Sequence, residues 1–475
     1  MLSFDDYVRH DALGLATLIR DGAVTAAEVV DAALARADAV DPAINALVAR
    51  RDDVVRGRAS GSPRDGVFAG VPFVFKDLFC WQEGWPAQAG SNLWKGFVAP
   101  VDFTHVRRVA ASGAIAVART ASSEYGISIS TESAAHGPTR NPWDLERSAG
   151  GSSGGTGAAV AAGIVPMGHG SDGGGSIRIP AANCGLFGLK PTRGRNPFGP
   201  FAGEGWAGLA TQHVLSRSVR DSAAMLDVTQ GPESGEPYAC PPPSRPYLEE
   251  VETEPGSLRV AFHLTGLGGT ALDPVTKAAV ADAVDLLQAL GHKVEEAHPD
   301  VDLAALAPAM MTVVGANQRL ALESRYAQLG REPEEGDVEA VTRAFAEYGG
   351  TVSAADYAEA LQAFHRLGRH FGTFFERYDV LVSTVLGQPP AQIGEIRTDC
   401  GDADDFLETV WDRMPVTQFF NITGCPAMSV PLYWSPSGLP IGIHVGAGFG
   451  REDLLFRLAG QLERARPWFH RRPAL

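Results

Sequence analysis

The sequence predicts an α/β protein, because segments typical of helices and of buried strands alternate along its first part. Thr25 and Glu28 have the S/T-x-x-E spacing of a capping box, which predicts a helix over residues 26–39. Residues 71–76 form an apolar run that predicts a buried strand, and Lys76 is its last, polar residue.

The alternation continues further along the chain. A helix is expected over residues 104–112 and a strand over residues 115–118. Residues 273–274 are of the types that cap and begin a helix. Residues 332–348 are expected to form a charged helix with a solvated face, and residues 378–386 a buried strand. This pattern favours the α/β class, and a length of 475 residues allows one to three domains.

The composition is that of an ordinary globular protein. Hydrophobic residues make up 45% and charged residues 20%, which excludes disorder for most of the chain. A net charge of −16 argues against a nucleic-acid-binding surface, which needs a basic face. The five cysteines include no C-x-x-C pair, which favours a reducing compartment. No segment resembles a secretory signal or a membrane span of ~20 apolar residues, so we expect a cytoplasmic protein that binds no membrane.

Glycine and serine are concentrated between residues 147 and 188. A flexible linker is the plainest explanation of such a composition. The same segment also contains residues 158–162, which are typical of a buried helix, and the apolar, proline-ended residues 177–180. A linker has no use for either, and we therefore look for the chemistry of the protein here.

Ser176 directly follows three consecutive glycines, Gly173, Gly174 and Gly175. Glycines leave their backbone N–H groups uncrowded, and successive N–H groups in a turn form a concavity for negative charge. An oxyanion formed by attack of the Ser176 hydroxyl on a carbonyl would meet these donors. A phosphate loop is the competing explanation, but no lysine follows these glycines as its pattern requires. The motif favours acyl transfer.

A serine nucleophile needs a base, and Lys76 is a candidate. Burial lowers the pKa of a lysine because it disfavours the cation, and the apolar residues 71–75 supply such surroundings. Asp77 would oppose this shift, but alternation along a strand points it to the other face. A purely structural lysine is equally compatible with the local sequence.

A second serine competes with Ser176 for the role of nucleophile. Residues 151–155 match the G-x-S-x-G pattern of the nucleophile elbow in α/β-hydrolases, with Ser153 at its centre. This short pattern recurs by chance in glycine-rich sequence, and it leaves Ser176 and Lys76 without a role.

Taken together, these motifs resemble the amidase signature family of serine hydrolases. The similar segments cover most of the chain and comprise residues 70–77, 150–155, 171–180, 184–185, 188–192, 421–427 and 438–442. The resemblance implies Ser176 as the nucleophile, Ser152 as a bridging serine after a cis peptide bond, and Lys76 as the base. The resemblance implies an interval of 24 residues between the bridging serine and Ser176, which selects Ser152 over Ser153, and Ser153 is kept as a substrate-binding candidate.

The resemblance also implies an oxyanion hole formed by the backbone N–H groups of Gly173, Gly174, Gly175 and Ser176. Ser171 departs from the family pattern, where threonine is commoner, but it keeps the hydroxyl. No metal ion and no organic cofactor are implied.

The fold implied by the resemblance is a single α/β/α layered domain over residues 1–475, built on a large, twisted, mixed and mostly parallel sheet. The core motifs fall within residues 65–220, and a more variable helical region over residues 225–375 is expected to shape the substrate pocket. Residues 137–143 and 450–455 are most similar to bacterial amidases of the 6-aminohexanoate cyclic dimer hydrolase type.

The expected activity is hydrolysis of carboxamide C–N bonds through an acyl-enzyme. Two alternatives stay open, an amidotransferase A-type subunit that releases ammonia from glutamine in a complex, and a non-catalytic binding protein on the same fold. The expected partner is a small-molecule amide, and association into a homo-oligomer is left open. Phe198, Phe201 and Trp206 are candidates for an apolar acyl pocket, which favours aryl or long-chain amides over acetamide.

Overall fold

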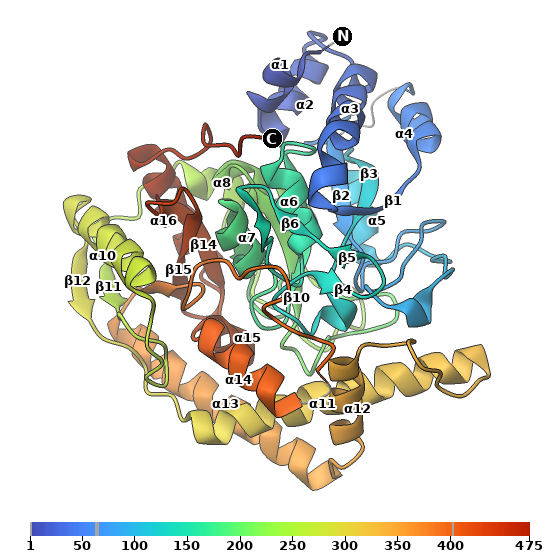
Figure 1. Cartoon of the computed structure of the whole chain (residues 1–475). Coiled ribbons are helices and arrows are strands. Elements are labelled where there is room, and N and C mark those ends of the chain that lie inside the picture. The colour runs from blue at the N-terminus through green and yellow to red at the C-terminus, as the bar shows by residue number, and fades with distance from the viewer. Residues whose placement is uncertain (1, 62–65, 401–402) are drawn as a thin grey trace.

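The computed structural model describes residues 2–61, 66–400 and 403–475 (Figure 1). Its main sheet has 11 strands in the order β1-β3-β2-β8-β10-β9-β14-β15-β13-β11-β12. Their bounds are β1 Leu47–Arg50, β2 Pro72–Lys76, β3 Ile115–Thr120, β8 Met167–Asp172, β9 Phe187–Lys190, β10 Thr211–Ser216, β11 Arg259–Phe262, β12 Lys293–Glu296, β13 Val380–Thr384, β14 Ala427–Trp434 and β15 Pro440–Ala447. Two small sheets pair β4 Glu132–Ser133 with β5 Gly137–Pro138, and β6 Arg140–Asn141 with β7 Asp144–Ser148.

The main sheet is mixed, as expected, but the expectation that it is mostly parallel was wrong. Among the described strands, six of the ten neighbouring pairs are antiparallel and four are parallel. The parallel pairs lie in two groups, β3-β2-β8 and β13-β11-β12, whereas all pairs from β8 through β10, β9, β14 and β15 to β13 are antiparallel. Strands β14 and β15 are joined by a short turn, and a short turn reverses the chain, whereas parallel strands need a long crossover.

Helices cover both faces of this sheet. Their bounds are α1 Phe4–Val8, α2 Ala12–Arg20, α3 Ala26–Ile44, α4 Asp52–Ala59, α5 Thr104–Ala111, α6 Gly154–Ala161, α7 Arg178–Cys184, α8 Val219–Thr229, α9 Tyr247–Val251, α10 Pro274–Ala289, α11 Leu303–Leu329, α12 Ala340–Gly349, α13 Ala354–Arg377, α14 Ala403–Arg413, α15 Thr417–Thr423 and α16 Glu452–Ala465, with short 3₁₀ turns η1 Asn92–Trp94 and η2 Glu124–Gly126.

The alternation of side chains along β9 shows which helices lie on which face. Phe187 and Leu189 pack into the core formed with α8, α10 and α16. Gly188, between them, faces Ala181 and Ile177 around α7. The sheet therefore lies between two helical layers, and α11, α12, α13 and α14 gather together at one end of the molecule (Figure 1).

Most elements predicted from local pattern are confirmed. The capping box of Thr25 and Glu28 is present, although α3 extends to Ile44 because Val40 and Ile44 continue its buried stripe. The structure contains the expected helix at 104–112, the helix that begins at 273–274 and the buried helix at 158–162, with shifted ends. It also contains the expected strands at 71–76, 115–118 and 378–386, again with shifted ends.

The expected charged helix at residues 332–348 was partly wrong. Helix α12 begins only at Ala340, and residues 332–339 are irregular. Its buried residues include Val341 and Phe345. These apolar residues are spaced at i and i+4, so they form one buried face that the many charges around them obscured in the sequence.

None of the helices in the described ranges is both long enough and apolar enough to span a membrane.

Candidate active site

Lys76 and Ser171 lie at the same edge of the main sheet. Strands β2 and β8 run parallel, with Val74 beside Gly168, so their carboxyl ends meet at one edge. Lys76 is the last residue of β2, while Ser171 and Asp172 are the last two of β8. The side chain of Lys76 is fully buried.

The Lys76 amine contacts hydroxyl groups. Its Nζ donates to Oγ of Ser152 at 2.7 Å and to Oγ of Ser171 at 3.0 Å. Burial lowers the pKa of Lys76 to about 7, although the charge of Asp172 acts in the opposite direction. A lysine with this pKa is partly neutral at neutral pH and is able to accept a proton.

Asp77 directly follows β2, and its carboxylate contacts groups other than the Lys76 amine. Its carboxylate lies 3.6 Å from the guanidinium of Arg119 and accepts a hydrogen bond from the N–H of Gln88 at 2.9 Å. These contacts hold the Asp77 charge away from the Lys76 amine.

Ser152 lies in the glycine-rich segment between β7 and α6. The Gly151–Ser152 peptide bond is cis. A Cβ on Gly151 would lie 2.7 Å from the carbonyl oxygen of Ser128, so a larger residue does not fit there. The hydroxyl of Thr131 accepts a hydrogen bond from the N–H of Gly154 at 3.1 Å. These contacts fix the backbone that carries the Ser152 hydroxyl.

Ser176 lies in a tight turn after β8. Gly175 has a φ of +148°, and a Cβ there would lie 2.6 Å from Oγ1 of Thr417. The Thr417 hydroxyl donates to the carbonyl oxygen of Gly174 at 2.6 Å. Within the described part of the chain, the N–H groups of residues 173–176 donate no hydrogen bond. They are therefore able to bind an anion that forms beside the Ser176 hydroxyl.

A buried ion pair beneath this turn was missed in the sequence. Nη2 of Arg178 donates to Oδ1 of Asp172 at 2.8 Å and to Oδ1 of Asn421 at 2.6 Å. Burial raises the pKa of Asp172, but the Arg178 charge outweighs it and, with hydrogen bonds, holds that pKa well below its usual range. Asp172 and Arg178 stand in the glycine-rich motif, and their opposite charges were the only signal. Asn421 lies 249 positions after Asp172, beyond the reach of a local pattern.

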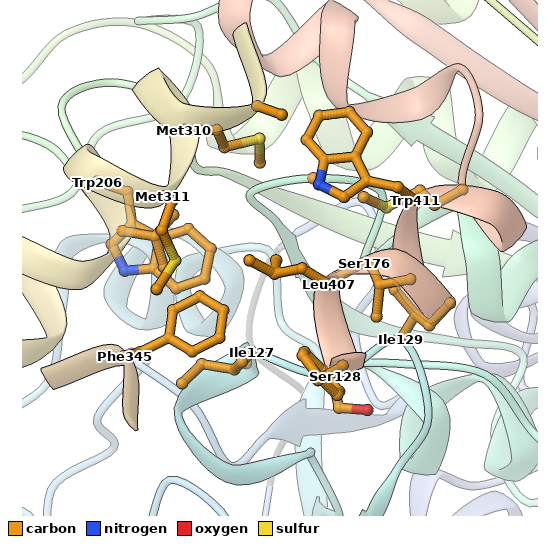
Figure 2. A pocket seen from close by; sticks show the side chains of 17 residues that line it. Ile127, Ser128, Ile129, Ser176, Trp206, Met310, Met311, Phe345, Leu407 and Trp411 are labelled. Atoms are coloured by element: carbon orange, nitrogen blue, oxygen red, sulfur yellow. The ribbon is translucent and has the colours of Figure 1, made fainter. Parts of the chain in front are cut away.

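One cavity beside Ser176 is lined mainly by apolar side chains, and Figure 2 shows it from close by. The space within its walls, including the part open to solvent, is about 640 Å³. We call it the methionine pocket, and its walls include Met310, Met311, Phe345, Leu407, Trp411 and Met414. Helices α11 and α12 belong to the region 225–375 that was expected to shape the pocket, whereas α14 lies outside it.

A second cavity also borders Ser176, and the space within its walls, including the part open to solvent, is about 1080 Å³. We call it the Ser152-side cavity, because Ser152 and Ser171 line it and do not line the methionine pocket. Ser176 and Trp206 line both cavities. Ser176 therefore lies where the two cavities meet.

The three aromatic pocket candidates have different environments. Trp206 lines both cavities, and Phe198 lines the Ser152-side cavity. Phe201 lines neither; it is 66% exposed and packs against Trp81 and Phe103. The candidate Phe201 was therefore wrong, because its side chain lies against Trp81 and Phe103 at the surface.

Ser153 is placed apart from the other candidates. It is fully buried at the start of α6, and its hydroxyl donates to the carbonyl oxygen of Ser171 at 3.3 Å. It lines neither of the two cavities beside Ser176. This position does not suit a nucleophile or a substrate-binding group.

The assembled groups are suited to acyl transfer: a serine hydroxyl, an amine of lowered pKa linked to a second hydroxyl, and a turn with unused N–H donors. Across the described ranges, no group of three or more His, Cys, Asp or Glu side chains is arranged to hold a metal ion.

Comparison with known proteins places this chain among the amide-bond hydrolases. The profile of the amidase family matches residues 28–456. The chain belongs to the amidase signature family.

Three known proteins illustrate the range of similarity. The 6-aminohexanoate-cyclic-dimer hydrolase of Paenarthrobacter ureafaciens is 37% identical, with 98% of this chain and 97% of that protein covered. A solved structure of 6-aminohexanoate cyclic dimer hydrolase superposes with a TM-score of 0.91 at 36% identity, over 98% of this chain and 99% of the other. The A-type subunit of glutamyl-tRNA(Gln) amidotransferase from Thermotoga maritima is more distant, and its structure superposes with a TM-score of 0.74 at 26% identity, over 98% and 95% of the two chains.

Proposed function

We propose that this protein hydrolyses carboxamides to a carboxylate plus ammonia or an amine through an acyl-enzyme on Ser176. The observation that carries the proposal is the 2.7 Å contact between Nζ of Lys76 and Oγ of Ser152, in a cavity that Ser152 shares with Ser176. The unused N–H groups of residues 173–176 support it.

The chemistry follows from these positions. Neutral Lys76 takes a proton from the Ser152 hydroxyl while Ser152 takes the proton of Ser176, whose Oγ forms a bond to the amide carbon. The carbonyl oxygen becomes an oxyanion held by the N–H groups of residues 173–176, each worth about 2.7–4 kcal/mol in comparable sites. The carbonyl then re-forms, the C–N bond breaks, and the nitrogen receives the proton back through Ser152. Water hydrolyses the acyl-enzyme with the same groups.

The apolar walls of the methionine pocket support an aryl or medium to long aliphatic acyl group rather than acetamide. The similarity to a protein named for a cyclic amide dimer supports the same substrate size. The amidotransferase alternative has weaker support, since its relative is 26% identical.

The test is amine or ammonia release from hexanamide, benzamide, an anilide, a cyclic diamide and glutamine. We expect Ser176→Ala to lower kcat by about 10⁴-fold or more, because the acyl-enzyme cannot form. Ser429→Ala is a matched control, because Ser429 is a fully buried serine that lines neither cavity and whose Oγ has no hydrogen-bond partner in the described part of the chain. Full activity in Ser176→Ala would overturn the proposal, and activity on glutamine alone would favour the amidotransferase.

A further inference from the structure

We infer that the methionine pocket is a site of reversible oxidation, in which hydrogen peroxide converts Met414 to its sulfoxide and thereby stops the hydrolysis. The reagent is a peroxide, and the atom that is oxidised is Sδ of Met414. The effect on activity rests on the proposed function, whereas the oxidation itself is measured without any substrate.

The methionines of this chain differ in their access to solvent. Six of them lie in the described ranges, and Met310, Met311 and Met414 line the methionine pocket. Figure 2 shows the side chains of Met310 and Met311 in its wall. Met310 is half-buried, and Met311 and Met414 are 8% and 6% exposed. The other three are 0% exposed and pack in the hydrophobic core: Met167, Met225 and Met428. Peroxide that enters the pocket therefore reaches only the first group of sulfurs.

Met414 lies against the turn that carries Ser176. A Cβ on Gly174 would lie 3.9 Å from Sδ of Met414, whereas the nearest atom of Met310 would be its methyl carbon Cε at 3.7 Å. In the described ranges, the N–H groups of residues 173–176 donate no hydrogen bond. The Met414 sulfur is therefore the one that lies beside these unused donors.

The backbone at Met414 is held on both sides. Its N–H donates to the carbonyl oxygen of Val410 at 2.8 Å. The carbonyl oxygens of its two neighbours in the sequence accept hydrogen bonds from the N–H groups of Gly387 and Leu267, at 2.9 and 3.1 Å. This segment cannot carry the side chain out of the pocket without breaking these bonds, so an oxidised Met414 stays beside the turn.

The oxidation needs no reagent other than peroxide. The sulfur lone pair attacks one oxygen of hydrogen peroxide, and an S–O bond forms as the O–O bond breaks. The second oxygen takes the proton of the first and leaves as water. The sulfur loses two electrons and the peroxide gains them. Methionine sulfoxide reductases reverse the change, because a dithiol supplies two electrons and the oxygen leaves as water.

The sulfoxide changes the site in two ways. It is polar, and the walls around it are mainly apolar, so binding of an apolar acyl chain weakens. Its oxygen also accepts hydrogen bonds, and the N–H groups of residues 173–176 lie beside it. A hydrogen bond from one of them uses a donor that the oxyanion needs. This second effect applies to every substrate, because every substrate forms its oxyanion at the same turn.

The test treats the whole protein with increasing concentrations of hydrogen peroxide, removes the peroxide with catalase, and adds dithiothreitol to reverse disulfide and sulfenic acid formation. Peptide mass spectrometry identifies the methionines that have gained oxygen, and circular dichroism shows whether the fold is kept. Activity is measured on hexanamide and on 4-nitrophenyl acetate, and the rate of Ser176→Ala is subtracted. The acetate isolates the effect on the turn, because its acyl group is too short to depend on the pocket walls.

The variants are Met414→Leu, Met310→Leu and, as the matched control from the closed core, Met225→Leu. Each is compared with its own untreated sample. We expect peroxide to lower kcat/KM of wild type about tenfold or more on both substrates, in step with the oxygen gained at Met414. Met225→Leu and Met310→Leu should lose as much on the acetate, whereas Met414→Leu should keep its rate. Methionine sulfoxide reductases should restore the wild-type rate.

An equal loss on the acetate in Met414→Leu and wild type would overturn the inference, as would full activity of protein that carries oxygen on Met414. Oxidation of Met225 as fast as Met414 would overturn the selective access. Failure of the proposed function is separate, because untreated wild-type protein would then show no hydrolysis that depends on Ser176, while mass spectrometry would still give the order of methionine oxidation.

Discussion

Lys76 is a fully buried lysine whose amine contacts two serine hydroxyls, and burial lowers its pKa to about 7. Lys190 is also fully buried, and burial, followed by the nearby charge of Arg178, lowers its pKa to about 7 as well. Its Nζ donates to the carbonyl oxygen of Pro191 at 2.7 Å, and it lines neither cavity. The two lysines share burial and pKa but differ in access to the substrate.

The first prediction concerns pH. If Lys76 is the base, it acts only when neutral, so kcat/KM on an amide should rise with pH, about tenfold per unit below an inflection near pH 7, and level off above it. Initial rates between about pH 5 and pH 9 measure this profile. Lys190→Met should keep the inflection. A profile that is flat from pH 6 to 8, or an inflection lost in Lys190→Met, would show that Lys76 is not the base.

At the scale of the element, the position of α12 against α11 sets the wall of the methionine pocket. Gly349 at the end of α12 packs against Gly315 in α11, and a Cβ on Gly349 would lie 2.1 Å from the carbonyl oxygen of Gly315. The two helices approach each other this closely because neither residue has a side chain. Phe345, which lines the pocket, is one turn away from Gly349 on α12.

The second prediction is that Gly349→Ala forces α12 away from α11. We expect a loss of about 1–3 kcal/mol in the free energy of unfolding, measured with denaturant, and a shift in acyl-chain preference as Phe345 moves. Gly372→Ala in α13 is the control, because its Cβ would meet no atom within 4 Å. It should stabilise the protein by about 0.5–1 kcal/mol. Stabilisation by both substitutions would argue against a tight contact between the helices.

At the scale of the whole molecule, the Asp172–Arg178 pair joins segments that are distant in sequence. Arg178 donates from Nη1 to the carbonyl oxygen of Thr417 at 2.8 Å and lies 3.0 Å from Nε2 of His444. Both members of the pair are completely buried. The turn that carries Ser176 is thereby tied to α15 and β15.

The third prediction is that Asp172→Asn lowers the free energy of unfolding by about 3–5 kcal/mol, because it leaves the Arg178 charge buried without its counter-charge. Chemical denaturation measures the loss. Asp399→Asn removes the carboxylate of an exposed ion pair, with 64% and 74% of the two side chains accessible, and should leave the free energy of unfolding unchanged. Similar stability of the two variants would mean that the buried pair does not hold the molecule together.

The prediction of one domain over residues 1–475 stays a prediction. We propose that it holds, because a single sheet contains strands from Leu47 to Ala447.

The sequence by itself determined the α/β class, most of the strands and helices near the site, and the candidates Lys76 and Ser176, whereas Ser152 came from the resemblance to the amidase signature family. These features depend on local chemistry: an apolar strand ending in a lysine, glycines that allow a tight turn, and a serine beside them. Local patterns are visible in a sequence because the residues that form them are neighbours.

Only the tertiary structure decided the directions of the strands, the walls of the two cavities and the partners of Asp172. Strand direction depends on which strands meet across the sheet, and the walls of the two cavities combine residues from Leu78 to Met414. The sequence also did not predict that Phe201 is exposed or that Phe345 and Gln318 are buried. Burial and contact between distant residues result from the packing of whole elements, and no local pattern contains them.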